Sequence, residues 1–173
     1  LNTTVYPFIL RGITLIGMAG AGKSGVGRIL APMLGWRFVD LDKLILEKQG
    51  MTHHEYMKLH GEQALKNLEE QLTLELDFQK TVFAPPGSVV YWKPEILQKI
   101  KQASTVVYLE TTPEIIEKRM GERLYQYGII GGLMAERVPL YEKMADYTFK
   151  SREQSKDEMA KIVMDGLKKA KII

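Results

Sequence analysis

The 173-residue sequence contains no cysteine, which excludes a disulfide framework, a thiolate zinc site and a catalytic thiol. It has no apolar run of the roughly 18–20 residues that a membrane-spanning helix requires, so we expect no membrane partner. An excess of charge is also missing, because 24 Lys and Arg residues against 21 Asp and Glu residues leave a formal net charge of +3. That small excess does not indicate nucleic-acid binding. The length and the ordinary composition predict one globular domain, which we expect to be monomeric and cytoplasmic.

Short apolar runs alternate with longer helical patterns, which is typical of α/β architecture. Five strands are predicted over residues 13–16, 38–40, 81–84, 105–109 and 147–149. Helices are predicted from Lys23 to Leu34, after Thr52, over residues 61–77, from Pro94, after Thr112 and after Ser155. Thr52 with Glu55, and Ser155 with Glu158, have the spacing of capping boxes. We therefore expect an α/β core over about residues 12–150 and a C-terminal helix over about residues 155–171.

One glycine-rich segment follows the first predicted strand and opens the first predicted helix. It reads Gly17-Met18-Ala19-Gly20-Ala21-Gly22-Lys23-Ser24 and matches G-x-x-x-x-G-K-[ST] at every fixed position. Backbone N–H groups in such a loop wrap a polyphosphate beside the positive end of the following helix. Lys23 can then reach the β- and γ-phosphates, while Ser24 ligates Mg²⁺. The predicted nucleotide-binding residues of this segment are Gly17, Ala19, Gly20, Ala21, Gly22, Lys23, Ser24 and Gly25.

Two carboxylates, Asp40 and Asp42, come at the end of the second predicted strand, where ligands bind in open α/β sheets. If the chain stays extended there, residues i and i+2 point the same way and the two side chains share one site. One carboxylate would then hold Mg²⁺ through water, and the other would take the proton of a substrate hydroxyl. The alternative is a pair of surface acids, with Asp42 capping the next helix.

Four stretches of the sequence, in the same order, resemble the shikimate kinase family of small P-loop phosphotransferases. The resemblance extends from about Ile13 to about Phe149, most of the chain. The stretches are residues 17–31; residues 35–42; Gly61-Glu62-Gln63-Ala64 with Leu68-Glu69; and Glu136-Arg137-Val138-Pro139-Leu140-Tyr141 with Ala145-Asp146. The resemblance implies a three-layer α/β/α P-loop kinase fold with a central five-stranded parallel sheet. It also implies ATP- and Mg²⁺-dependent phosphorylation of a small hydroxylated acid, with shikimate as the leading substrate.

The resemblance assigns roles to the matching positions. Lys23 would act in catalysis on the phosphates, Ser24 would bind Mg²⁺, and Asp40 would lie in the water shell of the metal. Asp42 would hold the acceptor hydroxyl as the second catalytic residue. Arg137 would bind the substrate carboxylate, for which two parallel N–H donors are well suited.

Three further positions take family roles with open alternatives. Arg119 falls where the family places an arginine against adenine, although a solvated helix face is the alternative reading. Lys66 stands where the family has a second arginine for the substrate carboxylate, and a lysine keeps the charge without the bidentate geometry. Gly87 is the glycine that remains of a three-glycine substrate loop, which here reads Pro85-Pro86-Gly87. The two prolines offer no N–H donors there.

The segment before Arg137 is shorter than in the family, and residues 125–132 contain no arginine where the family's lid carries one. A reduced lid favours slower transfer or leakage to water. We therefore retain two alternatives: a nucleotide-binding protein whose kinase activity is lost, and a kinase redirected to another acceptor. His53, His54 and His60 lack metal-ligand spacing, and we interpret them as surface or capping residues.

Overall fold

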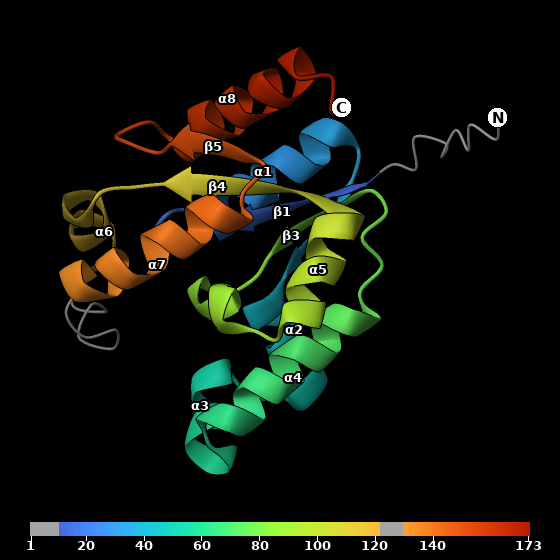
Figure 1. The fold of residues 1–173 in the computed structure, drawn as a ribbon, viewed down its shortest axis with the longest axis vertical. Coiled ribbons are helices and arrows are strands. Elements are labelled where there is room, and N and C mark those ends of the chain that lie inside the picture. Colours follow the sequence, from blue (N-terminus) through green and yellow to red (C-terminus); the bar gives the residue numbers. More distant parts are fainter. Residues whose placement is uncertain (1–10, 122–129) are drawn as a thin grey trace, which may run out of the picture.

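Five parallel strands form one sheet in the order β2-β3-β1-β4-β5 (Figure 1), in a computed structural model that describes residues 11–121 and 130–173. The strands are β1 (Gly12–Ile16), β2 (Arg37–Asp40), β3 (Thr81–Ala84), β4 (Ser104–Glu110) and β5 (Tyr147–Lys150). The register pairs Ile13 of β1 with Val82 of β3 and with Thr105 of β4. All four strand pairs are parallel. The predicted five-stranded parallel sheet is confirmed.

Helices cover both faces of the sheet. They are α1 (Lys23–Leu34), α2 (Leu41–Gln49), α3 (His53–His60), α4 (Glu62–Glu75), the 3₁₀ helix η1 (Gly87–Tyr91), α5 (Pro94–Ala103), α6 (Pro113–Met120), α7 (Ile130–Met144) and α8 (Lys156–Lys169). One hydrophobic cluster packs α1 and α8 against one face, and a second packs α2, α4, α5 and α7 against the other. Val82 and Phe83 are successive residues of β3 and belong to different clusters, Val82 to the first and Phe83 to the second. Successive side chains of a strand point to opposite faces of the sheet. The three-layer prediction is therefore confirmed.

Local sequence signals account for most helix ends. Both predicted capping boxes are present, at Thr52 with Glu55 before α3 and at Ser155 with Glu158 before α8. Gly35 ends α1 with a φ of 67°, a left-handed conformation that glycine adopts without steric cost. The alternative interpretation of Asp42 as a helix cap is wrong, because Asp40 caps α2 through a 3.1 Å hydrogen bond from the Asp42 backbone N–H.

The order of the strands brings the glycine-rich segment to the middle of the sheet. β1 lies between β3 and β4, and the chain crosses from one side of β1 to the other after β3. The crevice beyond the carboxyl end of a strand at such a switch point is where open α/β sheets bind ligands. The segment between β1 and α1 occupies this position.

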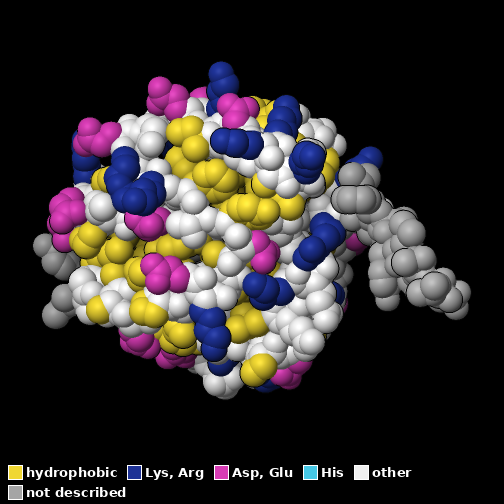
Figure 2. Space-filling view, turned by 45° about the horizontal axis from the view of Figure 1, so that its top comes forward, with side chains coloured by type: hydrophobic (Ala, Val, Ile, Leu, Met, Phe, Trp, Pro, Cys, Tyr) yellow, Lys and Arg dark blue, Asp and Glu magenta, His cyan; other side chains and the backbone are white. Residues whose placement is uncertain are grey.

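The remaining sequence expectations divide between described and undescribed residues. Tyr125 to Ile129 of the expected short lid lie outside the described residues, whereas Ile130, Gly131 and Gly132 form the first turn of α7. Within residues 11–121 and 130–173, no helix combines the length and apolar character needed to cross a membrane. Lys, Arg, Asp and Glu side chains are mixed on the face drawn in Figure 2, as the small net charge predicts.

Candidate active site

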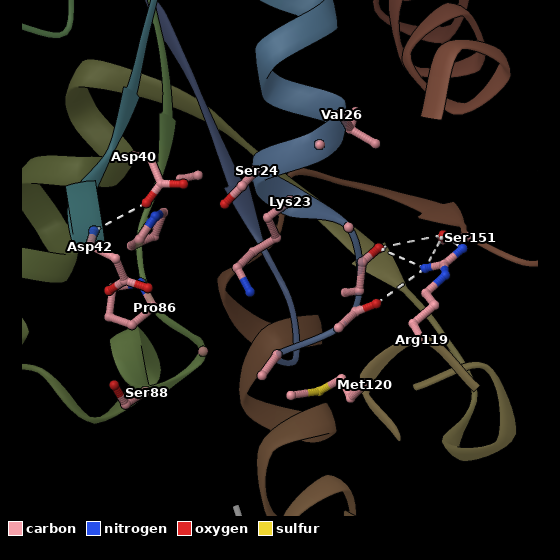
Figure 3. Close-up of a pocket in the computed structure, with 18 of the residues that line it drawn as sticks. Lys23, Ser24, Val26, Asp40, Asp42, Pro86, Ser88, Arg119, Met120 and Ser151 are labelled. Atoms are coloured by element: carbon pink, nitrogen blue, oxygen red, sulfur yellow. Dashed lines mark hydrogen bonds between the residues drawn. The ribbon is translucent and has the colours of Figure 1, made fainter. Parts of the chain in front are cut away.

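A cavity of about 1090 Å³ opens at the carboxyl edge of the sheet. Its size reaches the upper end of the range for small-molecule sites, so it has room for a nucleotide beside a second small molecule. Figure 3 shows Lys23 near its middle, with Asp40 and Asp42 on one side and Arg119 and Ser151 on the other. The predicted site residues that line it are Ala19, Gly20, Ala21, Gly22, Lys23, Ser24, Gly25, Asp40, Asp42, Gly87, Arg119 and Arg137.

The phosphate loop takes its shape from backbone conformations that favour glycine. Gly20 and Gly22 have φ values of 81° and 96°, which side chains with a Cβ rarely adopt. Gly17, which is not among the lining residues, accepts a 2.8 Å hydrogen bond from the Lys23 ammonium through its carbonyl oxygen. Met18 accepts a second one at 2.9 Å. These two hydrogen bonds hold the Lys23 ammonium at the centre of the loop.

Removal from water lowers the pKa of Lys23 to about 8, although the negative charges of Asp42 and Asp40 oppose the shift. A desolvated ammonium lacks the water that would otherwise neutralise part of its field. It is therefore well placed to bind an anion that enters the cavity. A polyphosphate would raise the pKa of Lys23 again by supplying negative charge.

Arg119 supports the loop from α6. Its guanidinium donates hydrogen bonds of 3.2 Å to the carbonyl oxygens of Gly20 and Ala21, and one of 2.9 Å to that of Arg152. These contacts exclude the solvated helix face as its environment. The predicted contact with adenine stays a prediction.

Asp40 and Asp42 share the cavity, but not for the reason that the sequence suggested. The strand ends at Asp40 and the helix begins at the next residue, so the two side chains are not alternate residues of an extended chain. Asp40 faces the cavity from the end of β2, and Asp42 from the first turn of α2. Burial raises the pKa of Asp42, and the neighbouring His53 partly offsets the effect.

Two histidines of α3 also line the cavity, which the sequence analysis missed. His53 Nδ1 lies 3.5 Å from Asp42 Oδ1, and the His54 ring centroid is 4.0 Å from that of His53. His53 and His54 are half-buried residues of the cavity wall, a position that the interpretation as surface or capping residues did not anticipate. The capping box at Thr52 marked them as the first residues of a helix, but no local signal shows which cavity that helix faces.

Glu69 is a third residue that the sequence analysis did not assign. It lines the cavity from α4 and is only 5% exposed, and burial together with the charge of Asp42 raises its pKa to about 7. A signal was available, because Glu69 lies between Leu65 and Leu72 on the buried stripe of α4. A charged residue in such a stripe is unusual and often has a functional role.

Arg137 reaches the cavity from α7, and Gly87 makes room for it. A Cβ on Gly87 would lie 3.2 Å from Arg137 Nη1 and 3.2 Å from the Tyr141 hydroxyl oxygen. That hydroxyl donates a 2.7 Å hydrogen bond to the carbonyl oxygen of Gly87, and the Tyr141 ring stacks on Tyr108 of β4 at 5.2 Å. The Arg137 guanidinium also lies 5.3 Å from the ring centroid of Tyr91. The guanidinium is thus oriented by aromatic contacts from η1 and α7.

Lys66 is the predicted substrate residue that the structure does not bring to the cavity. It is half-buried on α4 and is not among the lining residues. Pro85 and Pro86 do line the cavity beside Gly87. Pro86 immediately precedes η1 with an extended conformation, which proline adopts readily.

The oxygen donors of the cavity suit Mg²⁺. In the part of the chain that the structure describes, no group of three or more His, Asp or Glu side chains could hold a metal ion. Ser24 and Asp40 nevertheless line the cavity beside Lys23, and Mg²⁺ commonly binds through few protein oxygens together with phosphate oxygens and water. These residues therefore fit a magnesium ion that arrives with a nucleotide.

A parallel sheet with a phosphate loop after its central strand, and carboxylates facing the same cavity, defines the class of P-loop phosphotransferases. The family model for shikimate kinase matches residues 19–168. The chain belongs to the shikimate kinase family.

Relatives and solved structures agree with this membership. The shikimate kinase of Vibrio vulnificus strain YJ016 is 33% identical over 170 residues, which cover 92% of this chain and 95% of the relative. That of Enterococcus faecalis is 31% identical over 168 residues, 92% of this chain and 99% of the relative. The structure of shikimate kinase from Acinetobacter baumannii in complex with shikimate superposes with a TM-score of 0.87 at 28% identity, covering 95% of this chain and 96% of that one.

Proposed function

We propose that this chain transfers the γ-phosphoryl group of MgATP to a hydroxyl of shikimate, giving ADP and shikimate 3-phosphate. The observation that carries the proposal is a single cavity that holds a phosphate loop with Lys23 and, across from it, Asp42 and Arg137. The shikimate that accompanies the Acinetobacter baumannii relative supports the choice of acceptor.

The proposed reaction is an in-line displacement at the γ-phosphorus. The acceptor oxygen forms a bond to phosphorus, the bond from phosphorus to the β,γ-bridging oxygen breaks, and its electron pair leaves with ADP. The hydroxyl proton moves to Asp42, whose pKa is raised by burial, so that it accepts a proton more readily than an ordinary carboxylate. Lys23 and the N–H groups of the loop stabilise the charge that develops on the phosphate oxygens.

Mg²⁺ would neutralise phosphate charge when bound, with Ser24 as a direct ligand and Asp40 acting through water. On the acceptor side, we assign Arg137 to the carboxylate of the substrate because a guanidinium binds a carboxylate through two parallel donors. Gly87 keeps the space in front of that guanidinium open. Lys66 stays a proposed second cation near the acceptor.

ADP release from MgATP, measured with and without shikimate, tests the proposal. We expect shikimate-dependent release in the natural protein, none in Lys23→Ala, and none in Asp42→Asn. Calorimetric titration with ADP should show that Asp42→Asn keeps most of the nucleotide affinity, because Asp42 lies on the acceptor side.

Two outcomes would redirect the proposal. If the chain binds ATP but no hydroxy acid or polyol raises ADP release above background, it is a nucleotide-binding protein without kinase activity. If another hydroxy acid replaces shikimate, the Pro85-Pro86-Gly87 loop and Lys66 are the positions to examine first. The monomeric state and the cytoplasmic location stay predictions, which light scattering and cell fractionation would test.

A further inference from the structure

The inner oxygen of the Asp42 carboxylate is unusual. Asp42 Oδ1 is buried and accepts no hydrogen bond from the described residues. A buried carboxylate oxygen without a donor is costly, so its surroundings call for an explanation. The Asp42 side chain as a whole is nevertheless 47% exposed. Its exposure therefore lies away from Oδ1, on the part that faces the cavity.

The nearest ring nitrogen to this oxygen belongs to His53. The separation of 3.5 Å between Nδ1 and Oδ1 is slightly longer than a formed hydrogen bond. Contacts in an active site are commonly long before substrate binds and shorten in the reacting complex. His53 is the first residue of α3, and the capping box at Thr52 fixes where that helix begins. The imidazole is thus presented to Asp42 by an ordered helix end.

We propose that His53 is a positioning residue: its Nδ1–H binds Oδ1 of Asp42 and so turns Oδ2 toward the acceptor hydroxyl. The inference rests on the proposed kinase function, because it assigns the second oxygen of Asp42 to the acceptor. No proton leaves His53 in this arrangement. The imidazole acts as a fixed donor, and the acceptor proton goes to Oδ2.

The three histidines of α3 differ in their position relative to the cavity. His54, next along α3, lines the same cavity and lies against the His53 ring, so it limits the rotation of that ring. His60, at the other end of α3, is exposed and is not among the lining residues. His60 therefore provides a matched control on the same helix.

Steady-state ADP release tests the assignment, because it gives the shikimate-dependent kcat and the KM for ATP separately. We expect His53→Leu to lower the shikimate-dependent kcat about tenfold, the size of one lost hydrogen bond to a charged group. The KM for ATP should stay unchanged, because the phosphate loop is not touched. His53→Asn should keep kcat near that of the natural protein, since its amide N–H can occupy the place of Nδ1. His60→Leu should match the natural protein.

Either of two kinetic results would overturn the inference. One is an unchanged kcat in His53→Leu. The other is a kcat in His53→Asn as low as that of His53→Leu, which would show that the ring matters only for its shape. If His53→Leu loses stability, the His53→Asn variant decides the question alone.

Nitrogen NMR of the imidazole rings separates this inference from the proposed function, because it needs no turnover. We expect His53 Nδ1 to carry a proton, and Asp42→Asn to shift the signals of His53 but not those of His60. The absence of acceptor-dependent ADP release would contradict the kinase proposal. His53 signals that do not shift in Asp42→Asn would contradict the hydrogen bond between His53 and Asp42.

Discussion

The two ends of the cavity are built in different ways. The nucleotide end is built around one continuous segment, residues 19–25, whose backbone lines the cavity and whose shape depends on glycines with positive φ. The acceptor end is an assembly of side chains from α2, α3, α4, η1 and α7. A backbone site of this kind tolerates few changes, because its shape requires glycine at the positions with positive φ. A side-chain site can be altered one residue at a time, and the Pro85-Pro86-Gly87 departure from the family pattern lies there.

The largest effect is expected at the nucleotide end. Lys23→Met should lower turnover by about 10³-fold, because it removes the cation that faces the phosphates. The same change should raise the free energy of unfolding at pH 7 by about 1–2 kcal/mol, since a lysine with a lowered pKa is held charged at a cost. Because the lysine deprotonates above pH 8 in the folded state, this gain should shrink as the pH rises.

Urea unfolding at pH 7 and pH 9.5, together with ADP release, measures both parts of this prediction. Lys161→Met on the exposed surface of α8 is the matched control, and we expect no change in turnover. Loss of activity with loss of stability in Lys23→Met would contradict the prediction, because it would show that the lysine serves mainly to hold the loop together.

The acceptor end contains a buried ionisable group, Glu69. The free-energy cost of ionising it should appear in the pH dependence of the free energy of unfolding. The folded-state pKa of Glu69 is raised to about 7 from an ordinary 4.5, so the folded protein binds the extra proton between these values. Stability should therefore fall as the pH rises from 4.5 to 7, by on the order of 2 kcal/mol. Glu69→Gln should raise the melting temperature at pH 8 by about 5 °C and change it little at pH 4.5.

Calorimetric melting at both pH values tests this, with Glu47→Gln on the exposed side of α2 as the control. Equal melting temperatures for the natural protein and Glu69→Gln at pH 8 would mean that the carboxylate is compensated by a partner. The comparison with Lys23 is direct, because each end of the cavity then holds one ionisable group whose charged form is disfavoured by burial.

A smaller effect is expected from the cation that we assign to the acceptor carboxylate. Arg137→Lys keeps the charge but loses the paired donors, and should raise the KM for shikimate about tenfold. The Kd for ADP should not change, because Arg137 belongs to the acceptor end. Initial rates over a range of shikimate concentrations give the KM, and titration calorimetry gives the Kd. An equal rise in the KM for shikimate and in the Kd for ADP would contradict the assignment of Arg137 to the acceptor end alone.

The same division explains what the sequence could predict. The phosphate loop, the five strands, six of the helices and both capping boxes depend on neighbouring residues, so periodicity and motif spacing were sufficient to find them. The helices α7 and η1 were not predicted. His53 was not found, because its place beside Asp42 arises only when α3 packs beside α2. Glu69 was overlooked although its position in the buried stripe of α4 was a signal. Asp42 was placed in the right cavity for a wrong reason, since the chain turns into a helix where an extended strand was assumed.

The smallest effect is expected at Lys66, and it tests whether this lysine takes part in binding the acceptor. Because Lys66 is not among the residues that line the cavity, Lys66→Ala should raise the KM for shikimate less than about threefold, as an ion pair screened by water would. The Arg137→Lys variant, measured in the same assay, provides the reference. A tenfold rise in Lys66→Ala would instead show that α4 moves Lys66 into the cavity when the acceptor binds. In that case the acceptor end closes around its ligand, while the nucleotide end, whose lysine is already held by the loop, is formed in advance.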